Sequence, residues 1–95
     1  MPHQTPAITE PDIRVWCTAY LRGKLKLPDT VIDAHVDFAR LGLDSAESVL
    51  LVAAIEDWLG LELASDTAVK HPTLAQLARF VAGELENQSR ATTPR

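Results

Sequence analysis

Ser45 is the residue of this chain whose surroundings point most directly to chemistry. It ends the run Phe-Ala-Arg-Leu-Gly-Leu-Asp-Ser, which spans residues 38–45. A pattern of apolar residues with helical spacing begins directly after it, so the hydroxyl is expected at the exposed first turn of a helix. No histidine or lysine in this run could act as a base for the hydroxyl. The serine is therefore placed to be modified by another molecule, and not to attack a substrate itself.

The same residues also allow a purely structural interpretation. Asp44 is a favoured N-cap residue, because its carboxylate accepts a backbone N–H bond that contributes about 1 kcal/mol. Glu47, three residues later, would complete a capping box, and Gly42 would supply a positive φ for the turn. Ser45 would then be an ordinary residue at a helix start. Asp-Ser before a helix is too common to decide between the two interpretations on its own.

The complete run favours a modification site, because Phe-x-x-Leu-Gly-Leu-Asp-Ser resembles the phosphopantetheine-attachment signature of acyl carrier proteins. The resemblance extends over about residues 11–86. It implies that Ser45 carries a 4′-phosphopantetheine arm, donated from coenzyme A by a phosphopantetheinyl transferase. Gly42, Leu43 and Asp44 would form the rest of the cofactor-binding segment. Acyl groups would be held as thioesters on the thiol of the arm, and not on Cys17.

Composition restricts the classes of partner. Acidic residues outnumber Lys plus Arg by 13 to 9, for a formal net charge of −4, whereas nucleic-acid binding needs a basic face. No apolar run approaches the roughly 18 residues that a membrane-spanning helix needs. We therefore expect that the protein binds neither nucleic acid nor membranes. We also expect a monomer. A single cysteine and the lack of a signal-peptide pattern favour a cytoplasmic location.

The remaining reactive residue types suggest no catalytic site. Cys17 lies in an apolar helical pattern and is expected to be buried or half-buried. His3, His35 and His71 are too scattered in the sequence to suggest a metal site. We expect a protein without catalytic activity of its own.

The periodic patterns of the 95 residues predict one all-α domain. Apolar residues at spacings of three and four predict helices over residues 11–26, 45–59 and 73–85, with a short helix between Ser65 and Pro72. Residues 27–43 contain too many apolar side chains for a solvated loop, so we expect them to pack on the core, with one helical turn near residues 37–40. We expect a small four-helix bundle of the acyl-carrier type over residues 11–86, with three long helices and one short one. Flexible tails are expected at residues 1–10 and 87–95.

The helix expected over residues 45–59 has two apolar surfaces. The surface expected to face the core carries Leu51, Val52, Ile55 and Leu59. Val49 and Leu50 lie outside it, beside Ser45, and exposed apolar residues often mark partner contacts. In carrier proteins this helix is the usual docking surface, so the resemblance implies partner contacts at Glu47, Val49, Leu50, Glu56 and Asp57. Trp58 suits an interface and a half-buried position equally well.

Details of the motif narrow the type of carrier. Peptidyl carriers usually have Leu-Gly-Gly-His-Ser in place of Leu-Gly-Leu-Asp-Ser, and Leu50 stands where fatty-acid carriers commonly have glutamate. The chain therefore looks most like a polyketide-synthase carrier of polyketide or related secondary metabolism, and its first methionine favours a freestanding protein. The expected partners are a phosphopantetheinyl transferase, a ketosynthase and acyltransferase or an adenylating ligase, and tailoring enzymes.

Two alternatives stay open at this point. The first keeps the arm but changes the cargo, because an aryl or aminoacyl carrier charged by an adenylating ligase would share the motif. The second is a helical interaction module in which no cofactor is attached to Ser45.

Overall fold

The computed structural model describes residues 8–25 and 32–91. These residues form five helices and no strand, which confirms the all-α prediction with three long helices. The helices are α1 (Glu10–Leu25), α2 (Phe38–Leu41), α3 (Ser45–Leu59), α4 (Thr67–Lys70) and α5 (Leu74–Ala91).

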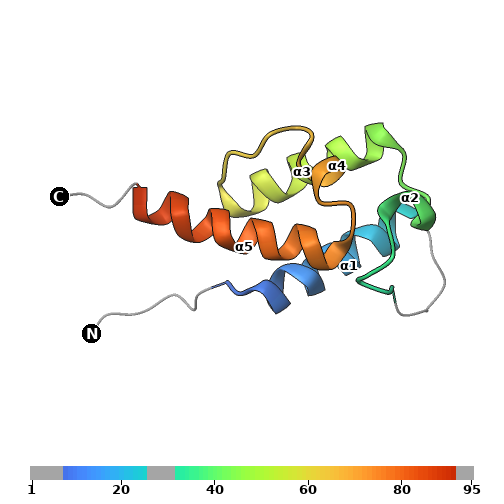
Figure 1. Ribbon diagram of the computed structural model, residues 1–95, viewed down its shortest axis with the longest axis horizontal. Helices are drawn as coiled ribbons and strands as arrows, with labels where there is room; N and C mark the ends of the chain where they lie inside the picture. The colour runs from blue at the N-terminus through green and yellow to red at the C-terminus, as the bar shows by residue number, and fades with distance from the viewer. Residues whose placement is uncertain (1–7, 26–31, 92–95) are drawn as a thin grey trace.

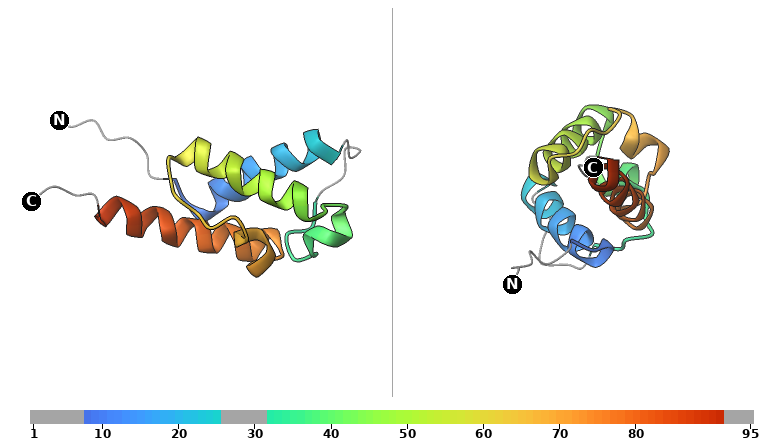
Figure 2. Two further views of the ribbon diagram at one scale, coloured as in Figure 1. Left: turned by 90° about the horizontal axis from the view of Figure 1, so that it is seen from above. Right: turned by 90° about the vertical axis from the view of Figure 1, so that its left-hand side faces the viewer.

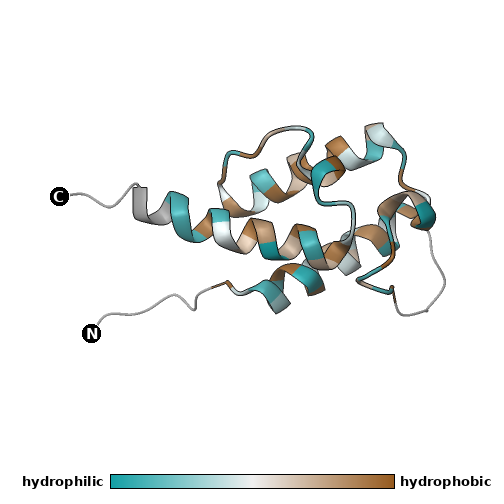
Figure 3. Cartoon of the chain, viewed as in Figure 1, coloured by the Kyte–Doolittle hydropathy of each residue, from teal (hydrophilic) through white to brown (hydrophobic). Residues whose placement is uncertain are grey.

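The three long helices pack along one another around a single core (Figures 1 and 2). α3 and α5 run in the same direction and α1 runs in the opposite one, with α2 and α4 near the end where α3 begins. Figure 3 shows hydrophobic and hydrophilic residues alternating along α1 and α5, so neither helix is apolar on all sides. Among the described residues, no helix combines the length and the apolar character that crossing a bilayer requires.

α1 begins one residue earlier than the sequence predicted, at Glu10. Thr9 precedes the helix, and its backbone N–H and its hydroxyl both donate hydrogen bonds to Asp12 Oδ2, at 2.9 and 3.0 Å. The N–H bond lowers the pKa of the Asp12 carboxyl, because it stabilises the charged form. The face predicted to be apolar is buried at Ile13, Cys17 and Leu21.

The connection between α1 and α3 packs on the core at Ile32, Phe38 and Leu41 as predicted, whereas Val36 is only half-buried and lies outside the core cluster. Ile32 and Phe38 are buried, whereas Val31 lies outside the described residues. The Phe38 N–H donates to the Pro72 carbonyl at 2.7 Å, and the Ala75 N–H donates to the Ala34 carbonyl at 2.8 Å. These bonds join the connection to the entry of α5 and satisfy backbone groups that an apolar segment removes from water.

α5 shows the clearest agreement and the clearest error of the predictions. The Thr73 hydroxyl accepts a hydrogen bond from the Gln76 N–H at 3.2 Å, so Thr73 caps the first turn of α5. The apolar residues at helical spacing along α5 are buried at Leu74, Leu77, Ala78 and Val81. The expected tail from residue 87 is wrong for residues 87–91, because α5 continues to Ala91. Residues 1–7 and 92–95 of the expected tails lie outside the described residues.

Trp58, whose environment the sequence left open, is half-buried and packs against α1. Its ring stacks on Trp16 of α1, with centroids 4.5 Å apart and planes 5° apart. Trp16 stacks in turn on Tyr20, with centroids 5.6 Å apart. All three residues are half-buried, so the stack closes the seam between α1 and α3.

Candidate functional site

The turn that leads into α3 depends on Gly42. This residue ends α2 with φ at 103°, a conformation that L side chains rarely adopt, so a glycine is required here. Its N–H donates to the Ala39 carbonyl at 3.1 Å, and the Leu43 N–H donates to the Phe38 carbonyl at 3.0 Å. The Leu43 side chain is buried. Gly42 therefore reverses the chain, and Leu43 fixes the reversed chain to the core.

Asp44 is the N-cap of α3, as the structural interpretation of the motif required. Its Oδ1 accepts a hydrogen bond from the Glu47 N–H at 2.8 Å. The capping function thus belongs to Asp44 alone and leaves the next residue without a role at the helix end. The two interpretations of the motif are compatible, because one assigns capping to Asp44 and the other assigns modification to Ser45.

Ser45 is the first residue of α3 and is exposed. Its hydroxyl makes no hydrogen bond with another described residue, so no neighbouring side chain holds it or activates it. The geometry agrees with a nucleophile that needs an external base.

The site fits a phosphodiester on the Ser45 hydroxyl. The first N–H groups of a helix have no partner within it, and the helix dipole favours an anion at this end by about 0.3–1 kcal/mol. The exposed position leaves room for a long arm. The negative carboxylates of Asp44 and Glu47 repel a phosphate, although the Asp44 carboxylate already accepts a hydrogen bond from the Glu47 N–H.

A mostly apolar surface runs along the outside of α3 and includes Ser45. We call it the α3 outer stripe, and its exposed members are Ser45, Ala46, Val49, Leu50, Ala53 and Asp57. Val49 and Leu50 are 42% and 47% exposed, whereas Leu51, Val52 and Ile55 are buried. The division of α3 into a core face and an exposed apolar face is thus confirmed. Half-buried Leu59 packs against the core cluster.

The three acidic residues expected at the docking surface occupy different environments. Asp57 is exposed in the α3 outer stripe, and Glu47 is half-buried beside it. Glu56 is also half-buried, and its Oε2 accepts a hydrogen bond from the Leu63 N–H at 2.8 Å. Glu56 therefore has a structural role that the sequence did not reveal.

α4 adds an exposed apolar residue that the sequence analysis missed. Val69 is 60% exposed, and α4 packs against α3. The two preceding residues, Thr67 and Ala68, are buried, so α4 is anchored and Val69 points outward from it. A helix of four residues is too short to show the periodicity that would have identified this face.

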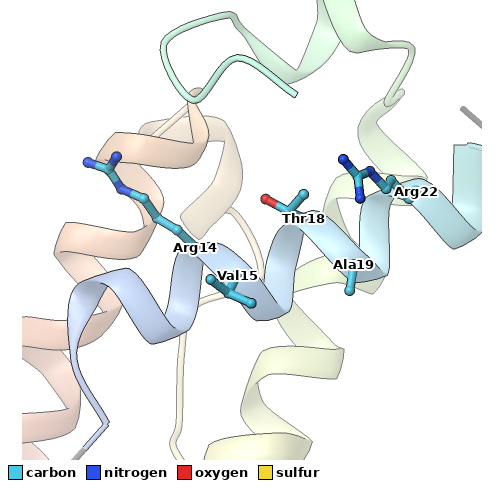
Figure 4. Close-up of a pocket in the computed structure, with 5 residues that line it drawn as sticks. All are labelled: Arg14, Val15, Thr18, Ala19 and Arg22. Atoms are coloured by element: carbon cyan, nitrogen blue, oxygen red, sulfur yellow. The ribbon is translucent and has the colours of Figure 1, made fainter. Parts of the chain in front are cut away.

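Other candidate features lie away from Ser45. Among residues 8–25 and 32–91, no group of three or more His, Cys, Asp or Glu could hold a metal ion. His71 instead stacks on Phe80, with ring centroids 4.3 Å apart. A pocket of about 290 Å³ lies on the outside of α1, where Figure 4 shows its lining of Arg14, Val15, Thr18, Ala19 and Arg22.

Comparisons with known proteins agree with this geometry. The model of the phosphopantetheine attachment site family matches residues 16–81, which include Ser45. Acyl carrier protein TtuC of Teredinibacter turnerae is 30% identical over 79 residues, or 83% of this chain and 91% of that protein. A phenolphthiocerol/phthiocerol polyketide synthase of Mycobacterium tuberculosis is 31% identical over 62 residues, which are 65% of this chain but 3% of that synthase.

A solved structure shares both the fold and a detectable sequence similarity. The HMG-ACPI domain of the CurA module from Lyngbya majuscula superposes with a TM-score of 0.76 and 26% identity, over 94% of this chain and 90% of that one. Proteins of the matched family carry 4′-phosphopantetheine, hold acyl intermediates on it, and are in general not catalysts themselves. This chain belongs to the phosphopantetheine-attachment family of carrier proteins.

Proposed function

We propose that Ser45 is the attachment point of the 4′-phosphopantetheine arm, and that Gly42, Leu43 and Asp44 shape the segment that presents it. One observation carries this assignment. Asp44 takes the capping role at the start of α3, while the adjacent Ser45 hydroxyl is exposed and makes no hydrogen bond with another described residue.

The attachment reaction needs little from the chain except this presentation. The Ser45 oxygen forms a bond to the β-phosphorus of coenzyme A, the pyrophosphate bond breaks, and 3′,5′-ADP leaves. The transferase must take the serine proton, because no described residue accepts a hydrogen bond from the hydroxyl. When bound, the group supplies a terminal thiol on which acyl groups are held as thioesters.

If the chain is a carrier without catalytic activity of its own, the reactivity of its thiols can be predicted. Measuring that reactivity also tests the proposed function. Cys17 is buried, and burial raises the pKa of its thiol from 9.0 to about 12, because the charged thiolate is disfavoured. At pH 8 the native unmodified protein should therefore react with a thiol reagent only after unfolding. Modification with coenzyme A should add one thiol that reacts in the native state, and modification with acetyl-coenzyme A should add none.

The same shift in pKa predicts how stability depends on pH. Cys17 ionises more easily in the unfolded chain, so its contribution to stability is complete below pH 9 and is lost as pH rises towards 12.

In the thiol assay, a reactive thiol that appears with time in the acetylated protein, with no enzyme present, would show hydrolysis by the chain itself. That result would contradict a role as carrier alone.

We place the docking surface for partner enzymes on the α3 outer stripe and on Glu47 beside it. Val49 and Leu50 supply exposed apolar area close to Ser45. Glu47 and Asp57 supply negative charge for basic patches on a transferase or synthase. Such charges mainly raise the rate of encounter and fix the orientation of the partner. Glu56 contributes less directly, because its carboxylate holds the Leu63 N–H.

Two substitutions test this surface. Glu47→Lys and Leu50→Glu should each slow modification by a phosphopantetheinyl transferase by about tenfold, through weaker encounter and the loss of apolar contact. Circular dichroism and thermal unfolding should stay close to wild type, because neither residue belongs to the core. Val15→Glu is the matched control, because Val15 is 70% exposed on α1. Wild-type rates for both α3 variants would place the docking surface elsewhere.

The related proteins support polyketide biosynthesis as the setting, with a ketosynthase, an acyltransferase and tailoring enzymes as partners. The chain is 38% identical over 65 residues to the non-reducing polyketide synthase phnA of Penicillium herquei, although these residues are 3% of that synthase. The motif also lacks the Gly-His pair that is usual in peptidyl carriers. An adenylating ligase that supplies aryl or aminoacyl groups remains the second candidate partner.

A further inference from the structure

The connection between α3 and α4 is held by side chains of two long helices. Figure 2 shows this segment running from the end of α3 back to α4. Gly60 turns the chain with φ at 69°, and no described strand pairs with the residues that follow. The backbone of Glu62 and Leu63 therefore needs other hydrogen-bond partners.

Gln88 supplies two of these bonds from α5. Its Oε1 accepts the Glu62 N–H at 3.0 Å, and its Nε2 donates to the Glu62 carbonyl at 2.9 Å. One side-chain amide thus pairs with both polar groups of a residue 26 positions away, as a neighbouring strand would. Gln88 Nε2 also donates to Glu84 Oε1 at 3.2 Å, which orients the amide.

Glu56 completes the clamp from α3. Its Oε2 accepts the Leu63 N–H at 2.8 Å, so consecutive N–H groups of the connection bind to different helices. We call Glu56 and Gln88 the connection clamp. Leu61, just before the clamped residues, is buried and adds an apolar anchor.

The clamped segment leads directly into α4. Ala64 lies between the two, and its carbonyl accepts the Thr67 N–H at 3.0 Å. The other end of α4 is fixed separately, because the Pro72 carbonyl accepts the Phe38 N–H at 2.7 Å and His71 stacks on Phe80. α4 is therefore held at both of its ends. The connection clamp fixes the N-terminal end.

We propose that Gln88 is a positioning residue for docking of the phosphopantetheinyl transferase. Together with Glu56 it fixes the connection and so holds α4, with exposed Val69, against α3, the helix that carries the outer stripe. This inference rests on the proposed function, because it assumes that an enzyme docks there. It also assigns a function to a residue outside 16–81, the span matched by the family model.

The structural half of the proposal is tested by amide exchange in the full chain, followed by NMR. Gln88→Ala should speed exchange of the Glu62 and Leu63 amides and of residues 67–70 by roughly three- to tenfold, as expected for one lost hydrogen-bond pair. Gln88→Glu keeps an acceptor for the Glu62 N–H but loses the donor, so its effect should be intermediate. Gln76→Ala is the matched control, because Gln76 is exposed on the same helix. Unchanged exchange in Gln88→Ala would overturn the clamp.

The functional half is tested with a promiscuous phosphopantetheinyl transferase, by varying the concentration of the unmodified carrier. Gln88→Ala should raise KM about three- to tenfold and leave kcat unchanged, because the surroundings of Ser45 are intact. Faster exchange with an unchanged KM would show that α4 takes no part in docking, and would overturn this half. If the wild-type protein accepts no arm at all, the proposed function fails, and the exchange experiment still decides whether the clamp exists.

Discussion

Replacing Ser45 by alanine is expected to abolish attachment of the arm completely. The reaction requires an oxygen nucleophile, and the hydroxyl of Ser45 is exposed at the start of α3. Incubation with a fluorescent coenzyme A analogue, magnesium and a promiscuous transferase should label the wild-type protein in a denaturing gel. The Ser45→Ala protein should show no label. Its fold should be unchanged, because Asp44 provides the cap.

Ser65→Ala is the control for this experiment, because Ser65 is also exposed but lies outside the motif. It should be labelled at the wild-type rate. Labelling of the Ser45→Ala protein would mean that another residue receives the arm, and the assignment of the site would be wrong.

Ile55→Ala should lower the free energy of unfolding by about 2–5 kcal/mol, because it leaves a cavity in a small core. Ile55 is 0% exposed and belongs to the hydrophobic cluster shared by the three long helices. Urea unfolding followed by circular dichroism measures the loss. Leu50→Ala on the same helix is the control, and should change stability by about 0.5 kcal/mol or less because Leu50 is 47% exposed.

The comparison of these two variants tests how α3 is oriented. Equal losses of stability would show that Leu50 is as well packed as Ile55. The α3 outer stripe would then not be available to partners.

The sequence predicted the parts of the fold that depend on local spacing. Apolar residues three and four positions apart determine which face of a helix is buried, so Leu51, Val52 and Ile55 were placed in the core correctly. The cap at Asp44 was also predictable, because a cap depends on a side chain and an N–H only three residues apart. The same locality made Ser45 recognisable as the reactive residue of the segment.

The features that the sequence did not reveal depend on contacts between distant residues. Glu56 looks like a solvated acid on a helix, and only the path of the chain after Gly60 brings the Leu63 N–H to it. Gln88 lies in a polar segment that resembled a tail, yet it binds Glu62. Such pairings leave no periodic pattern in the sequence. The prediction therefore relied on the polar composition of residues 87–95 and ended α5 too early.

The central claim, that this chain carries its cargo through an arm on Ser45, is tested most directly by mass spectrometry of the wild-type protein. The protein is incubated with coenzyme A, magnesium and a promiscuous phosphopantetheinyl transferase, then measured intact and after proteolysis. The account predicts the mass of one phosphopantetheine arm per chain, located by fragmentation on Ser45. An unchanged mass under conditions that modify a known carrier, or an arm located on another residue, would contradict it.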